Sequence, residues 1–286
     1  MGDETAEGRP AVPTDLAAKV ASELEHVRAA EKRTSDRLKL IRAKGRFLDG
    51  VREFAQDGSP GGLWLFLSDQ ERTLRRIELG GGEIPAWVDS LRHDLRGRLQ
   101  EMARTWPTDF VAALEERSIE PERGSRHPTY TFMDGFLSVH LDERKLAVRL
   151  ATRNTTPVML PLDPVAVADE VVTTRERLLG REFDADSFLQ GLLAAYEATS
   201  DEAGVPSGEE QRLPTVLDRY GKDHDRPGDE VLIDLGRLLR QGTPEHEGRR
   251  LRLGHTRRDK DGVLVPGFEA GGYLGFIAFR YEGDTA

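Results

Sequence analysis

Apolar side chains recur along residues 16–54 at alternating steps of three and four, with polar residues or glycine in some of the expected places. The apolar members of this seam are Val20, Leu24, Val27, Leu38, Ile41 and Leu48, and the interruptions are Glu31, Thr34 and Gly45. Such a broken heptad predicts one long amphipathic helix over 14–57, a candidate coiled coil whose seam another surface must cover.

The clearest β pattern lies in the middle of the chain. Apolar residues alternate with others at Leu137, Val139 and Leu141, and they are mirrored after the polar turn by Leu146, Val148 and Leu150. This predicts an antiparallel hairpin with Glu143-Arg144 at its tip and all six apolar side chains on one face. Residues 158–162 are a candidate third strand.

Segments whose apolar residues recur at helical spacing lie before and after this hairpin in the sequence. Apolar residues from Val88 to Met102 predict a helix that ends at Trp106-Pro107, because proline breaks helical hydrogen bonding. Asp163-Pro164 and Asp184 are each followed by a further helical pattern. Near the end of the chain, residues 231–240 predict a helix, and 249–257, 263–265 and 273–281 predict a β meander.

These elements predict an α+β fold with a helical region around a central antiparallel β-hairpin. The organisation along the chain is a disordered segment 1–13, the basic helix 14–57, a central α+β domain 63–198, a linker 199–211 and a smaller C-terminal α+β module 212–286. The linker is assigned because its residues are acidic or small, with Pro206 among them.

Composition narrows the class of protein. The 286 residues contain no cysteine, which excludes disulfides, thiol nucleophiles and thiolate zinc sites and favours a reducing compartment. The sequence shows neither an apolar signal-peptide core nor an 18-residue apolar run, so we expect a cytoplasmic protein that does not enter a membrane.

Charge singles out the predicted N-terminal helix. Between Arg28 and Arg46 there are eight basic and two acidic residues, a local balance of +6 in a chain of net charge −10. On the heptad, one stripe beside the seam carries Arg28, Lys32, Lys39, Arg42 and Arg46. Like charges at this spacing repel, so the stripe indicates an anionic neighbour. That neighbour is the acidic remainder of the chain, a protein partner or second copy, or nucleic-acid phosphate.

A second basic cluster lies near the C-terminus. If residues 249–258 form a strand, Arg250, Arg252 and Arg258 share one face. They are then either phosphate-binding candidates or charges that protect an edge strand from pairing with another chain.

No motif predicts a catalytic residue, a metal site or a cofactor. Ser residues lack a nucleophile elbow, and Gly80-Gly81-Gly82 lacks the Lys of a phosphate-binding loop. We expect His140 and Asp142 to point to opposite faces of the hairpin tip, which prevents joint metal binding. An active site assembled from scattered residues would leave no such motif.

The sequence therefore favours a non-enzymatic assembly subunit of a cytoplasmic complex, which docks a protein partner or self-associates through its N-terminal helix. The alternative is a nucleic-acid-binding subunit that uses the basic stripe and the basic C-terminal hairpin.

Overall fold

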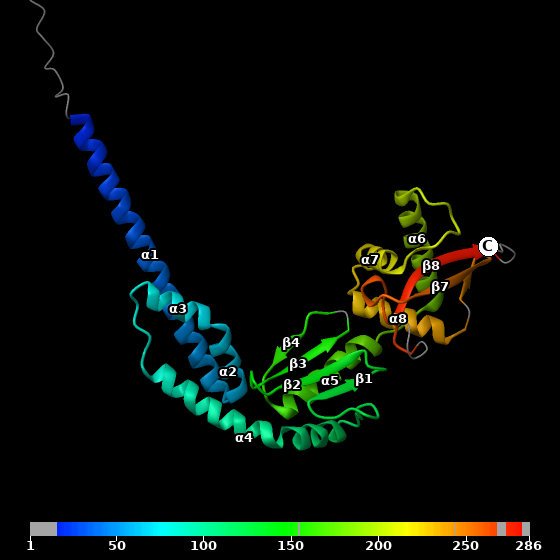
Figure 1. The fold of residues 1–286 in the computed structure, drawn as a ribbon, viewed down its shortest axis with the longest axis horizontal. Coiled ribbons are helices and arrows are strands. Elements are labelled where there is room, and N and C mark those ends of the chain that lie inside the picture. The colour runs from blue at the N-terminus through cyan, green and yellow to red at the C-terminus, as the bar shows by residue number, and fades with distance from the viewer. Residues whose placement is uncertain (1–15, 154, 243, 268–272, 282–286) are drawn as a thin grey trace, which may run out of the picture. The chain divides into compact units, whose positions relative to one another are not determined.

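The computed structural model describes residues 16–153, 155–242, 244–267 and 273–281 (Figure 1). Within these ranges, eight α-helices and two four-stranded antiparallel sheets confirm the α+β class and the long N-terminal helix. The disorder predicted for residues 1–13 concerns a segment outside the described residues.

The chain divides into two compact units. The first unit comprises residues up to 59 and residues 66–93, and the second comprises residues 60–65 and 94–286. The first contains α1 (Leu16–Asp57), the last four residues of α2 (Pro60–Asp69) and all of α3 (Glu71–Leu79). The helix α4 (Trp87–Glu116) begins in the first unit and continues into the second.

The core of the first unit forms around the C-terminal half of α1. Phe47 and Val51 of α1 are buried, as are Leu74 and Ile77 of α3. The ring of Phe66, from α2, lies 6.0 Å from the ring of Phe47, centre to centre, in a stacked arrangement. Only the second half of α1 is therefore held by packing within its own unit.

In the second unit, sheet A follows chain order as a meander. Its strands are β1 (Thr129–Phe132), β2 (Leu137–Asp142), β3 (Ala147–Thr152) and β4 (Val158–Leu160). One face packs against α4 and α5 (Pro164–Leu179) through a continuous hydrophobic core. The predicted hairpin and third strand are confirmed, and β1 is an additional strand that the pattern did not reveal.

The hairpin register differs from the predicted one by two residues. A tip at Glu143-Arg144 would place Val139 opposite Val148, whereas β2 and β3 pair Val139 with Leu150 and close with a longer turn. Leu146 adopts φ 53° in that turn and is still buried. Because side chains alternate with a period of two, a two-residue shift keeps the same side chains on the buried face.

The predicted helix break at Trp106-Pro107 is wrong, because α4 runs through both residues. An internal proline costs about 3 kcal/mol in a helix. Here Trp106 and Phe110 are fully buried, with ring centres 4.5 Å apart, and Leu114 is buried one turn later. Burial of these large side chains against sheet A outweighs the local cost of the proline.

Sheet B has the strand order β5-β8-β7-β6. It consists of β5 (Gln211–Arg212), β6 (Glu245–His246), β7 (Arg249–Thr256) and β8 (Tyr273–Tyr281), with a 3-10 turn η1 (Asp259–Asp261) between the last two. The chain thus forms a C-terminal meander through β6, β7 and β8. The strand predicted at 263–265 is wrong, since Val263 makes only an isolated bridge to Leu274.

Three helices complete the core beside sheet B: α6 (Ala185–Ala203), α7 (Leu213–Asp223) and α8 (Gly228–Arg240). The segment 199–211, expected to be a free linker, starts inside α6 and ends in β5. The hydroxyl of Tyr196 donates to Glu209 O at 2.7 Å and accepts from Gly208 N at 2.9 Å. Small and acidic residues therefore form an anchored turn here. The domain boundary drawn at this segment stays a prediction.

Candidate functional site

The N-terminal half of α1 is the most exposed element among the described residues. Every side chain from residue 18 to residue 39 is exposed. The seam residues Val20, Leu24, Val27, Leu38 and Ile41 are between 45% and 60% exposed, and Leu48, nearer the core, is half-buried. The structure thus leaves the predicted seam largely uncovered.

Within the first unit, α2 and α3 instead pack against a different face of α1. Leu40, Phe47 and Phe54 recur every seven residues and point toward α2 and α3, with Phe54 and Phe66 ring centres 5.3 Å apart. On a helical wheel, this series lies opposite the side that carries Leu24 and Leu38. Sequence reasoning missed this series because the longer seam masked it, although its seven-residue spacing was visible.

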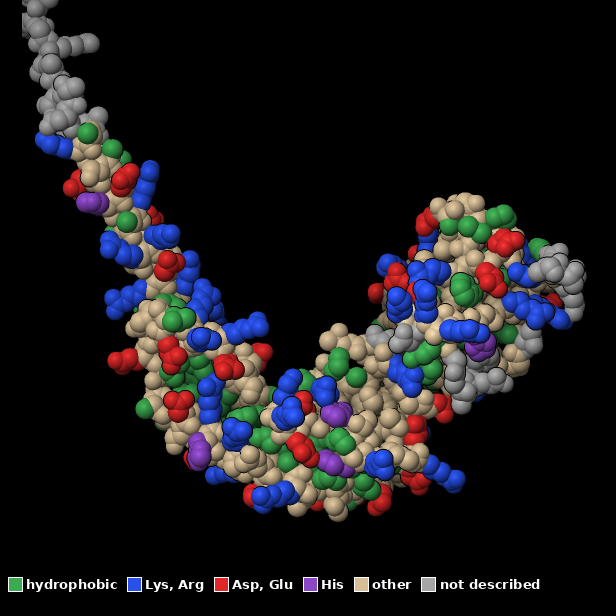
Figure 2. All heavy atoms as spheres, viewed as in Figure 1, with side chains coloured by type: hydrophobic (Ala, Val, Ile, Leu, Met, Phe, Trp, Pro, Cys, Tyr) green, Lys and Arg blue, Asp and Glu red, His purple; other side chains and the backbone are tan. Residues whose placement is uncertain are grey.

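The basic stripe also points away from the core of the first unit. Arg28, Lys32, Lys39, Arg42 and Arg46 are all exposed, and Figure 2 shows Lys and Arg side chains along the N-terminal half of α1. Lys39 Nζ lies 3.2 Å from Asp36 Oδ1, an exposed pair on the same helix. Such pairs contribute little to stability, so the stripe remains electropositive.

A hollow of about 640 Å³ lies beside this free face, between α1 and the end of α3. Leu40, Ile41 and Ile77 supply its apolar lining, and Arg33 and Arg37 are among its charged residues. The first unit therefore presents an apolar seam and a concave basic surface side by side.

The C-terminal arginines are less available than the stripe. Arg252 is exposed on β7, opposite Ala278. Arg250 donates to Glu245 Oε2 at 3.1 Å. Arg258 lies beyond the end of β7, with Nη1 3.9 Å from Asp261 Oδ2, so the expected common face of three arginines contains only Arg250 and Arg252.

Sequence reasoning missed a buried charge cluster centred on Asp234 of α8, whose side chain is 1% exposed. Its Oδ1 accepts a hydrogen bond from Arg181 Nη2 at 2.8 Å, and its Oδ2 accepts one from Arg226 Nη1 at 2.9 Å. Arg237 Nη1 lies 3.7 Å from Oδ1. Arg237 lies three residues after Asp234 on α8 and Arg226 eight residues before it, whereas Arg181 is 53 residues away, so local spacing could have revealed only the pair with Arg237.

The cluster continues toward α5 through Asp229, which is also buried. Arg177 donates to Asp229 Oδ2 at 2.8 Å and to Glu230 Oε1 at 3.1 Å. The hydrogen bond to Asp229 raises the pKa of the Arg177 guanidinium. This network joins α5 to α8 and satisfies buried carboxylates, which is a structural role.

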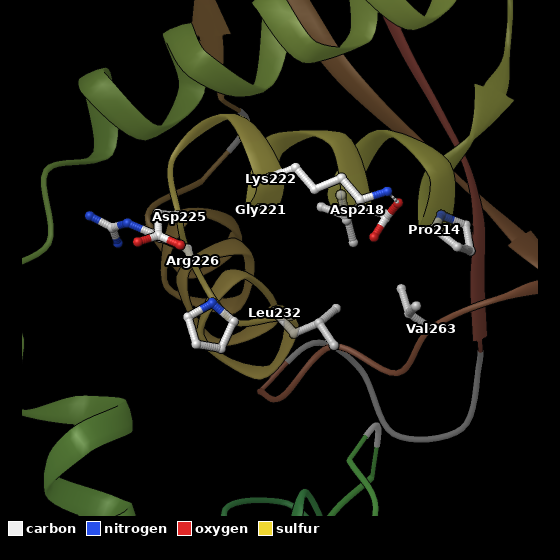
Figure 3. Close-up of a pocket in the computed structure, with 11 residues that line it drawn as sticks. Pro214, Asp218, Gly221, Lys222, Asp225, Arg226, Leu232 and Val263 are labelled. Atoms are coloured by element: carbon white, nitrogen blue, oxygen red, sulfur yellow. Dashed lines mark hydrogen bonds and ion pairs between the residues drawn. The ribbon is translucent and has the colours of Figure 1, made fainter.

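A cavity of about 550 Å³ opens between α7 and α8 (Figure 3). Its apolar lining includes Leu217, Leu232 and Val263. At its rim, Lys222 Nζ lies 2.6 Å from Asp218 Oδ2, as the dashed line in Figure 3 shows. Asp225 and Arg226 also line the cavity, so it combines an apolar surface with two acidic and two basic residues.

The expectation that His140 and Asp142 lie on opposite faces is wrong, because residues two apart in a strand share a face. Both are half-buried on β2. His140 Nδ1 lies 2.8 Å from Thr129 Oγ1, and Asp142 lies 3.8 Å from Arg149 Nη2. Burial, and then the charge of Arg149, lower the pKa of His140. These contacts join neighbouring strands of sheet A.

Comparison with protein-family models, curated proteins and solved structures gave no match. In the ranges that the structure describes, no group of three or more His, Asp or Glu residues could hold a metal ion. None of the described helices combines the length and apolar character needed to cross a membrane.

Proposed function

We propose that this protein is a non-enzymatic assembly or adaptor subunit of a cytoplasmic multiprotein complex, and that it docks through α1. The observation that carries the proposal is the exposure of the whole stretch 18–39 together with its apolar seam. Most helical stability in proteins comes from packing of an apolar face, and a helix without it is marginal in water. Burying each seam side chain fully would contribute about 1.5–3 kcal/mol.

Substitutions that place charged side chains in the seam test this proposal. Replacing Leu38 and Ile41 with Asp would put two carboxylates into the apolar contact, so we expect the wild type to sediment as a dimer or larger and the double variant as a monomer. Sedimentation velocity over the micromolar range measures this directly.

The control for the charge itself is His26→Asp with Ala29→Asp. Both residues are exposed on α1, on the side opposite the seam, and the variant adds the same number of acids to the same helix. It should assemble like the wild type. If the seam variant and this control assemble equally well, α1 does not dock through its seam.

The exposure of all five stripe residues also favours the alternative, nucleic-acid binding. Phosphate contacts release about 0.9 counterions each, so such binding would weaken steeply with salt. The net charge of −10 opposes contact with a polyanion over the rest of the surface.

We therefore expect the wild type not to bind duplex or single-stranded nucleic acid at about 50 mM salt, a condition that favours phosphate contacts. Fluorescence anisotropy measures the binding, with Lys39→Glu plus Arg42→Glu as the comparison. Tight, salt-sensitive binding that the double variant weakens, with a flatter salt slope, would establish the alternative. A loss of thermal stability in that variant would instead show that the stripe packs on the protein's own acidic surface.

A further inference from the structure

We infer that the seam is covered by α1 of a second copy of this chain, lying antiparallel, with Val20 of one copy level with Gly45 of the other. The inference rests on the proposed docking function of α1 and names the partner. The two copies would be related by a twofold axis level with residues 32 and 33, the symmetry of most dimers.

The apolar layers pair well in this register. Leu24 of one copy faces Ile41 of the other, and Val27 faces Leu38, and the twofold axis repeats each layer. Among the residues of α1 whose exposure the structure describes, these are four of the five exposed large apolar residues, and Val20 is the fifth. The pairing therefore buries the exposed seam residues of both copies in one contact surface.

The three interruptions of the heptad also find suitable neighbours. Gly45 faces Val20, and a Cβ placed on Gly45 would meet nothing within 4 Å, so the space is open for the side chain of a second copy. Glu31 faces Thr34, whose hydroxyl donates to Ala30 O at 2.9 Å at the surface of the helix. The two Glu31 residues then occupy adjacent layers on either side of the twofold axis, each opposite a threonine, and do not share one layer.

A parallel, in-register pair would place each residue opposite itself. Two Glu31 carboxylates would then share one seam layer, where like charges repel strongly. Two Gly45 residues would leave a layer without side chains, which forfeits the burial that stabilises a coiled coil. The interruptions of the heptad thus argue against the parallel arrangement and are accommodated in the antiparallel one.

Charge complementarity points the same way. The stretch 28–46 carries eight basic and two acidic residues, and a parallel pair would lay this stretch on itself. In the antiparallel pair, the acidic residues Glu23 and Glu25 come level with Arg42 and Leu40 of the second copy. Residues 38–46, with four basic side chains and no acidic one, then lie beside residues 19–27 of the second copy, which carry two glutamates and one lysine. Each copy therefore supplies acidic residues beside the most basic part of the other copy's stretch, and only residues 28–37 still lie on themselves.

The absence of cysteine from the chain makes a site-specific cross-linking test direct. Val27→Cys and Leu38→Cys are prepared as separate proteins, mixed so that subunits exchange, and oxidised mildly before non-reducing electrophoresis. We expect cross-linked dimer from the mixture and none from either variant alone, because residue 27 faces residue 38. An Ala29→Cys variant, on the opposite side of α1, is the control for random collision.

Each contrary result has a distinct meaning. Cross-linking by Leu38→Cys alone would establish a parallel pair, and a dimer in which no combination cross-links would exclude the register; both overturn the inference. A monomeric wild type would overturn self-association, while docking of α1 to a different protein would survive. The proposed function itself fails only if replacing Leu38 and Ile41 with Asp leaves every assembly intact. Sedimentation of each cysteine variant confirms that it keeps the state of the wild type.

Discussion

Replacement of Asp234 by alanine is expected to lower the free energy of unfolding of the second unit by about 3–5 kcal/mol, the usual effect of removing one partner from a buried ion pair. Its carboxylate accepts hydrogen bonds from Arg181 and Arg226 and lies near Arg237. Without it, Arg181 would keep Glu230, whose Oε2 lies 3.5 Å from its Nη1, while Arg226 and Arg237 would lose the buried carboxylate that they now face. Urea unfolding measures the loss.

Asp218→Ala is the matched control, because it also removes a carboxylate from a helix in the same core region. Asp218 pairs with Lys222 one turn away, and both side chains are more than half exposed. Exposed pairs of this kind contribute about 0.3–0.5 kcal/mol. Equal losses in the two variants would show that the Asp234 cluster is solvated and does not hold α8 in place.

Trp106→Ala is expected to cost about 3–5 kcal/mol, since it removes a fully buried aromatic side chain from the contact between α4 and sheet A. The ring of Trp106 stacks on Phe110 and lies 6.1 Å from the ring of Tyr130, centre to centre. Removing it opens a cavity beside the proline within α4. Thermal or urea unfolding of the variant gives the magnitude.

Trp106→Phe distinguishes packing from polarity at the same site. Within the described residues, the indole Nε1 of Trp106 is buried without a hydrogen-bond partner. Phenylalanine keeps an aromatic ring against Phe110 and removes that N–H group, so we expect a clearly smaller loss than for alanine. A loss as large as that of Trp106→Ala would contradict the claim that ring packing carries α4 through Pro107.

The long helix, the α+β class and the buried face of the hairpin could be predicted because each depends on periodicity alone. In α1, repeated steps of three and four residues are enough to define a helix, even one whose first half is exposed. In the hairpin, the predicted register was wrong by two residues, but the predicted inward face was correct, because a shift of two residues preserves the alternation of side chains.

Where local preference and packing disagreed, only the tertiary structure decided the outcome. Pro107 reads locally as a helix end, but the burial of Trp106 and Phe110 keeps α4 continuous. The face of α1 that packs is the one carrying Phe47, because it meets Phe66, whereas the longer seam of apolar residues stays exposed. Asp234 also pairs with Arg181, which is 53 residues away, and a contact between such distant segments has no local signature. Periodicity determined which faces are apolar, and the three-dimensional packing decided which of them are covered.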